Sequence, residues 1–467
     1  MNNFLVETNR LFKKIETTYK VNELYIDEIR IWPLIRFILF EKISRHKKLS
    51  TKQKLYQKYY DLKYTEKITD SSNKFENIID INEKNDLIFI TDDHFYVNFN
   101  GKYHNKYLDP IIENIKYDFE FKKLHLYSKI SNDKFIPSYK ILDHEEICDI
   151  KIEPEIINFF ESIKHEFKNT IFKNVDLSNL KEVLIGKFRD INYGKMFIQS
   201  LKYKPLSIFY CSYTTPFKLG INVQAKKSGI HTVDVQHGKQ GKNQPLYTNW
   251  NTVPSNKYEM LPEIFWNWND LSKNRIELLE NNVPSGLKSV VSGYQIPTSL
   301  IKKSKFSNTI LVTLQPLNFQ NISYLQKFLK DFIKKDKKYN WIIKPHPKQN
   351  LIEVKKIRRE LNFKNVTIDT EKNIFELLSI AFLHITEYSS VAYESLAYGI
   401  HTIFTNKIAL DEFEDELRNG LFTYCENIID LEKLIDSLKN SSPKKTTEIN
   451  MSKNYLKLEP LNYIKKL

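Results

Sequence analysis

The sequence has 467 residues, of which 41% are hydrophobic and 27% are charged. This length exceeds what one ordinary core holds, so two domains are expected, and the composition excludes a disordered chain. The 71 basic and 57 acidic residues give a net charge of +14, which favours anionic partners such as nucleotide phosphates, nucleic acid or an acidic membrane surface. A lysine-rich solvated surface would produce the same excess, so charge alone does not choose among them.

The cysteines and the apolar runs indicate the cellular compartment in which the protein is expected. Cys148, Cys211 and Cys425 are far apart, which suits a reducing cytoplasm and argues against a cysteine-based metal site. The start MNNFLVETNRLFKKIE lacks the apolar run of a signal peptide. The run IRIWPLIRFILF (29–40) is too short and too charged to span a bilayer, and we interpret it as a buried or surface-docked helix that begins near Trp32.

The first half of the chain alternates strand and helix signals. A strand is predicted over 86–91 (DLIFIT), and 205–213, 216–229 and 231–236 read as a strand, a helix that Gly229 ends, and a second strand. This βαβ unit implies a parallel sheet.

Two segments between the halves carry other signals. Residues 241–280 are rich in aromatic residues, and we predict irregular structure there. We interpret Trp266 and Trp268 as core residues rather than as part of a groove on which sugars stack. Proline, glycine and serine cluster over 281–297, where we place the domain hinge.

The second half repeats the α/β pattern. Strands are predicted at 309–316, 340–347, 366–370, 381–386 and 401–406, and helices at 322–335, 351–361, 373–379, 389–399 and 431–440. The predicted fold class is α/β, with two Rossmann-like domains that face across a cleft. The expected divisions are a helical N-terminal segment at 1–70, an acceptor domain at 71–290, a nucleotide-donor domain at 291–440, and a C-terminal helix at 441–467 that packs back on the first domain.

The stretch WIIKPHPKQ fixes a histidine at the end of a strand. Proline cannot donate to a sheet ladder, so the strand stops where His346 stands between Pro345 and Pro347, next to Lys344. In doubly wound sheets, ligands bind beyond the carboxyl ends of the strands. A rigid turn with a surface histidine is the simpler alternative for an isolated His-Pro pair.

The stretch ITEYSSVAYESLAYG (385–399) follows another strand end. Ser389 and Ser390 open a helix, whose first N–H groups and dipole favour an anion, and Glu394 lies one turn further on. A plain helix cap would need only one serine. We interpret the pattern as a nucleotide site in which Lys344, His346 and the serines bind phosphate and Glu394 binds ribose.

Two strand ends of the first half carry candidate catalytic groups. Asp92 and Asp93 follow the strand 86–91 as possible general bases, with an ordinary acidic loop as the alternative, and His237 is the fallback base. Asp109 is read as a helix cap before Pro110. The residues expected to line the cleft are Gln236, Gly238 and Glu387. The 11 histidines show no HExxH or other paired spacing, so neither a catalytic metal nor a cofactor is expected.

The order QHG, KPHP and EYSS with a helix ending in ESLAYG resembles bacterial GT-B glycosyltransferases of surface (capsule and lipopolysaccharide) polysaccharide assembly, over roughly 86–440. It is most similar to transferases that use CMP-activated sugars, for Kdo and polysialic acid, and to the CDP-glycerol glycerophosphotransferases of teichoic-acid synthesis. The resemblance implies a GT-B fold, metal-independent inverting transfer in the cytoplasm or at the inner face of the membrane, and donor contacts at His346, Pro347, Ser389 and Ser390.

The leading hypothesis is transfer of a sugar from a nucleotide-sugar donor to a glycan or lipid-linked glycan acceptor, with an anionic membrane as a peripheral partner and no nucleic acid. Phosphopolyol transfer from a CDP-alcohol and nucleotide-sugar 2-epimerisation remain as alternatives within the same architecture. A basic anion-binding module would explain the charge without catalysis. It would not explain why three polar motifs all fall at strand ends.

Overall fold

A computed structural model describes residues 4–48, 83–99, 101–126, 134–141, 150–241, 243–278, 285–294, 308–315, 329–346, 349, 351–440 and 464. The chain divides into two compact units, each described by itself. Unit 1 comprises Met1–Tyr96, Asn100–Ser292 and Glu459–Leu467, and unit 2 comprises Val97–Phe99 and Gly293–Leu458.

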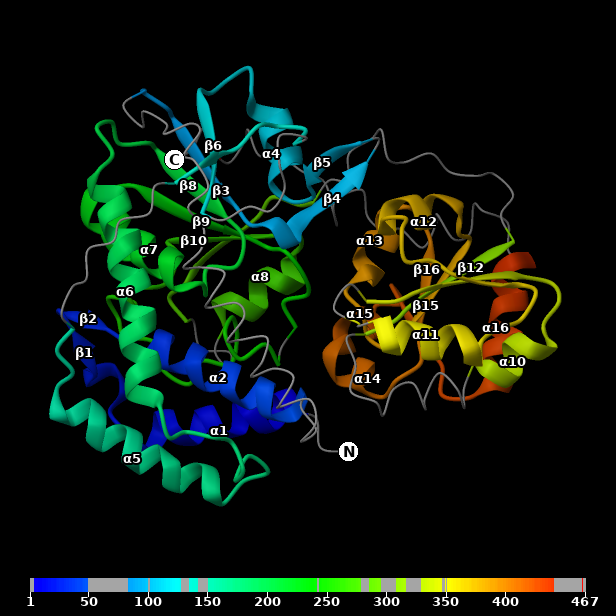
Figure 1. Ribbon diagram of the computed structural model, residues 1–467, viewed down its shortest axis with the longest axis horizontal. Helices are drawn as coiled ribbons and strands as arrows, with labels where there is room; N and C mark the ends of the chain where they lie inside the picture. Colours follow the sequence, from blue (N-terminus) through cyan, green and yellow to red (C-terminus); the bar gives the residue numbers. More distant parts are fainter. Residues whose placement is uncertain are drawn as a thin grey trace. The chain divides into compact units, whose positions relative to one another are not determined.

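Unit 1 is built on a seven-stranded parallel sheet, in the order β11-β10-β9-β8-β3-β6-β7 (Figure 1). The strands are β3 (Leu87–Thr91), β6 (Phe121–His125), β7 (Tyr139–Lys140), β8 (Ser207–Tyr210), β9 (His231–Val235), β10 (Ile264–Asn267) and β11 (Lys288–Val291). β3 and β8 are buried at every position, as expected for strands covered on both faces. The predicted β8–helix–β9 unit is confirmed.

The sequence analysis was wrong about 241–280 and missed the strand at 288–291. Residues 264–267 form β10, and α8 (Asp270–Glu277) follows it. The two asparagines at the end of this strand each have a partner inside the protein: the Asn267 amide donates to Ser289, and the Asn269 side chain caps α8 by accepting from the Ser272 N–H. Trp266 and Trp268 are buried, as predicted.

Two glycines let a pair of helices in unit 1 approach closely. α6 (Leu180–Gln199) crosses α7 (Pro216–Ser228), and Gly229 ends α7 in a left-handed conformation at φ +70°. A Cβ at Gly194 would lie 2.0 Å from the Phe217 carbonyl oxygen, and one at Gly220 would lie 1.9 Å from the Ile191 carbonyl oxygen. Glycine is therefore required at both positions of the crossing, and the backbone of α7 is fixed there.

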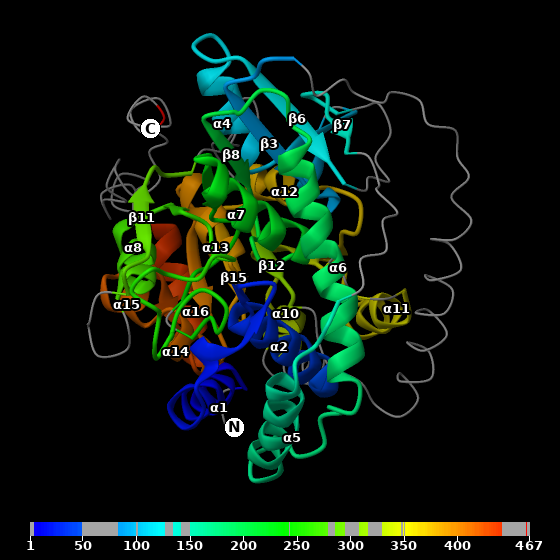
Figure 2. The same cartoon turned by 90° about the vertical axis from the view of Figure 1, so that its left-hand side faces the viewer.

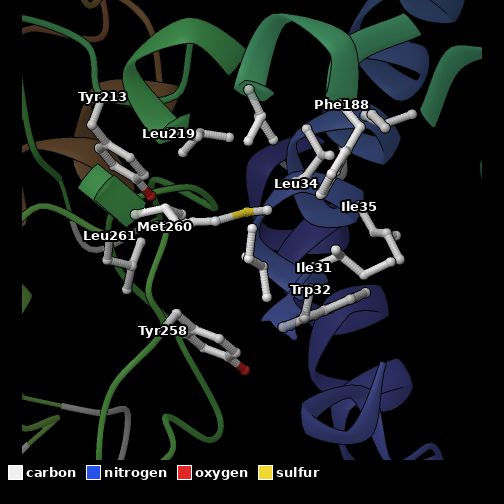
Figure 3. Packing of buried hydrophobic residues seen from close by; sticks show 14 of the residues in the cluster. Ile31, Trp32, Leu34, Ile35, Phe188, Tyr213, Leu219, Tyr258, Met260 and Leu261 are labelled. Carbon is white, nitrogen blue, oxygen red and sulfur yellow. The ribbon is translucent and has the colours of Figure 1, made fainter. Parts of the chain in front are cut away.

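The N-terminal helices join the core of unit 1. α1 (Phe4–Thr18) and α2 (Trp32–Lys48) gather with α5 (Pro154–Lys168) at one end of the unit (Figure 2). Figure 3 shows side chains of α2, of α6 and of 258–261 meeting in one apolar cluster. Arg36 is buried among them and donates to Glu16 and to the Pro245 carbonyl oxygen. The predicted helix from Trp32 and the helical start of the chain are confirmed over 4–48; the rest of the 1–70 segment lies mostly outside the described residues.

The remaining elements of the first half are short. β1 (Tyr25–Ile26) pairs with β2 (Ile29–Arg30), and two further short strands are β4 (Tyr96–Phe99) and β5 (Lys102–Asn105). Two 3-10 turns (Val21–Glu23 and Asp93–Phe95) and the helix α4 (Leu108–Ile115) complete the set.

Unit 2 holds a six-stranded parallel sheet in the order β14-β13-β12-β15-β16-β17. Its strands are β12 (Thr309–Thr313), β13 (Asn340–Lys344), β14 (Val366–Ile368), β15 (Leu383–Thr386), β16 (His401–Phe404) and β17 (Thr423–Tyr424). Its helices are α10 (Lys330–Lys335), α11 (Leu351–Glu360), α12 (Ile374–Ile380), α13 (Val391–Ala397), α14 (Ile408–Glu412), α15 (Glu414–Arg418) and α16 (Ile428–Asn440).

The predicted α/β order of the second half is confirmed over the described residues. Most of the helix predicted at 322–335 lies outside them, and its end is described as α10. The C-terminal helix predicted at 441–467 also lies outside the described residues, except for Ile464, which is helical and buried.

Candidate functional site

Polar residues from distant parts of the sequence meet where four neighbouring strands of unit 1 end. β9, β8, β3 and β6 lie side by side and run parallel, so their carboxyl ends share one edge of the sheet. Gln236 follows β9, Cys211 follows β8, Asp92 follows β3, and His125 is the last residue of β6. We call this line of residues the unit 1 edge. It is the kind of edge at which doubly wound sheets bind ligands.

A buried ion pair holds Asp92 at the unit 1 edge. The Lys218 ammonium, which comes from α7, lies 2.5 Å from Asp92 Oδ2 and donates to the Cys211 carbonyl oxygen at 2.6 Å. The Lys218 side chain is completely buried, whereas 22% of the Asp92 side chain is exposed. The sequence analysis missed Lys218. Its one signal is a single charge within the apolar run PFKLGI.

His237 lies beside this pair as a neutral imidazole. Its ring packs against Phe95, with 5.1 Å between centroids, and its Nδ1 is buried with no hydrogen-bond partner among the described residues. Burial is the main cause that lowers the pKa of His237 to about 3; the positive charges of Lys218 and His94 contribute to the shift, while Asp92 opposes it. The edge thus brings together two of the three predicted catalytic residues, Asp92 and His237, and disfavours a proton on the histidine.

Asp234 is a second buried carboxyl near the same lysine. It lies within β9 and is completely buried, and burial raises its pKa to about 8 against the lowering effects of the Lys218 ammonium, the Tyr247 hydroxyl and the backbone N–H groups of Tyr213 and Ser212. Ser212 adopts a left-handed conformation at φ +60°. Such strain persists only where surrounding contacts hold it. The sequence analysis treated Asp234 as an ordinary strand residue.

Asp93 faces different charges from those around Asp92. Its negative charge acts on His125 and Lys134. The Lys134 ammonium donates to Ser138 Oγ at 2.8 Å, and Ser138 Oγ lies 2.9 Å from His125 Nδ1. Burial lowers the pKa of Lys134 to about 8 and that of His125 to about 4. The two adjacent aspartates therefore belong to separate polar clusters.

Asp109 is not the helix cap that the sequence analysis predicted. It lies inside the first turn of α4, completely buried, and its Oδ1 is 2.5 Å from the Lys123 ammonium. The Asn105 side chain takes the capping role, because its Oδ1 accepts from the N–H groups of Tyr107 and Leu108. Burial raises the pKa of Asp109 to about 6 and lowers that of Lys123, although each charge favours the ionised form of the other.

The predicted cleft-lining residues of unit 1 have structural contacts. Gln236 is completely buried; its amide donates to the Gly238 carbonyl oxygen at 2.9 Å and its Oε1 accepts from the Trp268 N–H at 2.8 Å. A Cβ at Gly238 would meet nothing within 4 Å. Gln236 therefore ties β9 to the end of β10, and a ligand contact at either residue stays a prediction.

In unit 2, Lys344 is the last residue of β13, and His346 follows the end of this strand. The Lys344 ammonium is half-buried, which lowers its pKa; it donates to the Lys372 carbonyl oxygen at 2.5 Å and lies 3.9 Å from Asp369 Oδ1. The His346 N–H donates to Gln349 Oε1 at 2.7 Å, closing a tight turn. Pro347 lies outside the described residues. The phosphate-binding roles of these residues stay predictions.

The serine pair of unit 2 precedes α13, which begins at Val391. Ser389 Oγ accepts from the Val391 N–H at 3.2 Å, whereas the Ser390 side chain makes no capping hydrogen bond. Glu394 is buried on α13, and burial raises the pKa of buried Glu387 to about 8. Ser389, Ser390 and Glu387 thus follow β15 as predicted, but only Ser389 acts in the helix start. Their ligand contacts, and that of Glu394, stay predictions.

No group of three or more His, Cys, Asp or Glu side chains among the described residues could hold a metal ion. Metal-independent chemistry stays a prediction. None of the described helices combines the length and the apolar character needed to cross a bilayer.

No protein-family model matches the sequence, and no curated protein matches it. Solved structures do match. A putative UDP-N-acetylglucosamine 2-epimerase from Listeria monocytogenes is 11% identical at a TM-score of 0.50, over 82% of this chain and 95% of that one. The UDP-GlcNAc 2-epimerase from Neisseria meningitidis bound to UDP-GlcNAc is 14% identical (TM-score 0.48; 81% and 98% covered), and the calicheamicin glycosyltransferase CalG4 is 11% identical (TM-score 0.44; 81% and 96% covered).

The likeness at a TM-score of 0.50 concerns the fold alone. Together with the two parallel sheets, it confirms the predicted fold class, an α/β protein with two Rossmann-like units of the GT-B type.

Proposed function

We propose that this GT-B-type protein is a glycosyltransferase that moves a sugar from a nucleotide-sugar donor to a cell-surface glycan or a lipid-linked glycan. CMP-activated sugars are the favoured donors. The observation that carries the proposal is the Asp92 carboxylate, which is partly exposed at the carboxyl ends of the unit 1 strands and paired with buried Lys218 beside neutral His237. The proposal places the acceptor at unit 1 and the nucleotide at unit 2.

The reaction assigned to these groups is a single displacement. Asp92 takes the proton from the acceptor hydroxyl, whose oxygen attacks the anomeric carbon of the sugar from the face opposite the nucleotide. The bond between the anomeric carbon and the phosphate oxygen breaks, and its electron pair leaves with the nucleotide. The configuration inverts. No cofactor is proposed, since the nucleotide-sugar is a substrate.

The leaving phosphate gains negative charge, which unit 2 is proposed to stabilise. His346 and the backbone N–H groups after Ser389 and Ser390 are the proposed donors, with Lys344 supplying positive charge nearby. Glu394 is the proposed ribose contact. This arrangement needs no metal, so transfer should survive EDTA. We further propose that the protein works in the cytoplasm, at the inner face of the cell membrane, where the net charge of +14 favours anionic lipid.

A nucleotide-sugar 2-epimerase is the second candidate, because the Listeria protein that bears this name shares the fold. The two functions differ in one requirement. An epimerase changes the sugar of its nucleotide-sugar without an acceptor, whereas a transferase releases free nucleotide and a lengthened glycan only when an acceptor is present.

The test begins with thermal unfolding in the presence of CMP, CDP, UDP, GDP or dTDP. A nucleotide at a hundred times its dissociation constant stabilises the protein by about 2.7 kcal/mol, which a melting curve detects. His346→Ala should remove most of that stabilisation, while His165→Ala, at an exposed position of α5, should leave it unchanged.

The second step uses the sugar donors of the nucleotide that binds, with and without glycan acceptors, and mass spectrometry of the products. A lengthened glycan supports transfer. Conversion of the nucleotide-sugar without acceptor would replace this proposal by epimerisation, and no nucleotide binding at all would refute both.

A further inference from the structure

Lys218 is buried at a cost that its contacts must offset. A lysine ammonium without water is strongly unfavourable unless it is paired and hydrogen-bonded. Its partners come from two strand ends, Asp92 Oδ2 after β3 and the Cys211 carbonyl oxygen after β8. One cation therefore joins the carboxyl ends of two adjacent strands.

The backbone that carries Lys218 is fixed. It stands in the first turn of α7, two residues before Gly220, where α6 leaves no room for a Cβ. On the strand side, the Lys218 ammonium donates to the Cys211 carbonyl oxygen, in the turn after β8 where Ser212 adopts a left-handed conformation. Both ends of the lysine are thus anchored, and a small shift of either would move the carboxylate.

The contact leaves Asp92 competent to take a proton. Lys218 engages Oδ2, and no described residue donates a hydrogen bond to Oδ1. With 22% of its side chain exposed, Asp92 can meet an acceptor hydroxyl through that second oxygen. A carboxylate locked by one oxygen and open at the other has the geometry of an oriented general base.

Asp93 and His237 are the other candidate general bases, and their surroundings favour that role less. Asp93 faces the separate cluster of Lys134 and His125. A proton accepted by His237 would create a cation that burial and Lys218 both oppose. We propose that Lys218 is the positioning residue that orients Asp92 as the general base, and that Asp93 takes no part in proton transfer; this rests on the proposed transferase function.

The test is a double-mutant cycle on turnover, with donor binding measured in parallel. Lys218→Met should lower the turnover number by a factor of about 10 to 10² while the dissociation constant of the donor nucleotide stays within about twofold. In an Asp92→Asn background the same change should cost less than about twofold, because the base that it orients is already gone. Lys218→Arg should keep more turnover than Lys218→Met. Lys227→Met, an exposed lysine on the same helix, should match the wild type.

The outcomes separate the inference from the function on which it rests. Equal losses in both backgrounds would mean that Lys218 only stabilises the fold, and wild-type turnover in Lys218→Met would refute any role; either result overturns the inference while the transferase stands. If Lys218→Met does not fold, the cycle is run with Lys218→Arg. A loss of turnover in the wild-type background alone is then expected, and an equal loss of turnover in both backgrounds would contradict the inference. A wild-type protein with no transfer to any acceptor overturns the function and the inference together.

Discussion

The strand ends of the two sheets differ in what their polar residues bind. In unit 1, Asp92 pairs with Lys218, which is 126 residues away along the chain, where two adjacent strands end. In unit 2, the His346 N–H binds Gln349 and Ser389 Oγ binds the Val391 N–H, contacts that span only three and two residues. The comparison shows that Asp92 is held by a partner distant in sequence, whereas His346 and Ser389 make local turn contacts. Lys344 differs from them, because it donates to the Lys372 carbonyl oxygen, 28 residues further on.

The largest effect is expected when the base is removed from the unit 1 edge. Asp92→Asn should lower turnover by a factor of about 10² to 10⁴ with donor binding unchanged, because the acceptor proton has no carboxylate to receive it. Asp93→Asn, the matched control at the neighbouring residue, should keep a turnover number within a few-fold of the wild type. Steady-state kinetics with fixed donor and acceptor measures both. Near wild-type rates in both variants, with a dead His237→Ala, would reassign the base to His237.

The second expectation concerns the stability of unit 1. Lys123→Met leaves the Asp109 carboxylate buried without its cation, which should cost about 3–5 kcal/mol of unfolding free energy. Lys122→Met breaks a surface pair with exposed Glu83 and a contact with the Tyr139 ring, and should cost much less. The decrease in unfolding free energy of each variant is measured by amide hydrogen exchange in β6 and α4. Equal protection in the two variants would show that the buried pair is not what holds these elements together.

The third expectation is a pH dependence of stability. The folded pKa of Asp234, about 8, is raised above its ordinary value of 3.8, so the folded state holds the proton more tightly than the unfolded state. The free energy of unfolding of unit 1 should therefore fall as pH rises from about 4 through 8, by at most about 1.4 kcal/mol per pH unit from this group.

Asp234→Asn should remove that part of the slope, and Asp118→Asn, at an exposed position, should not. Glu387→Gln should act in the same way on unit 2, since the pKa of Glu387 is also raised to about 8. Hydrogen exchange as a function of pH measures each unit by itself. An unchanged slope in Asp234→Asn would mean that this carboxyl is not held protonated by burial.

The smallest effect is expected at the local turns of unit 2. Ser389→Ala removes the hydroxyl that accepts from the Val391 N–H and should cost about 0.5–1 kcal/mol, whereas Ser390→Ala loses no capping bond and should cost less than about 0.3 kcal/mol. Chemical denaturation followed by the fluorescence of Trp341, the tryptophan of this unit, compares them. A larger loss at Ser390 would show that its hydroxyl has a structural role.

The sequence by itself determined the fold class and the ends of several strands, although it missed β6 and β11. Buried parallel strands such as 87–91 read as apolar runs, and proline and glycine punctuate them, as at Pro345 and Gly229, so local chemistry defines these boundaries. The sequence did not predict the strand at 264–267, because asparagine is typical of loops. Asn267 fits in a buried strand because its amide donates to Ser289 on β11.

Only the tertiary structure decided which of the polar residues act together. Nothing local links Asp92 to Lys218 or separates Asp92 from Asp93, and nothing in HTVDV marks Asp234 as buried beside a lysine from the preceding helix. Asp109 before Pro110 has the sequence of a cap, yet β6 places Lys123 against it and Asn105 takes the cap. Whether a charged group is paired, exposed or protonated depends on the residues that other segments place next to it. Burial has this effect because it removes the water that would otherwise solvate the charge and screen it from its neighbours.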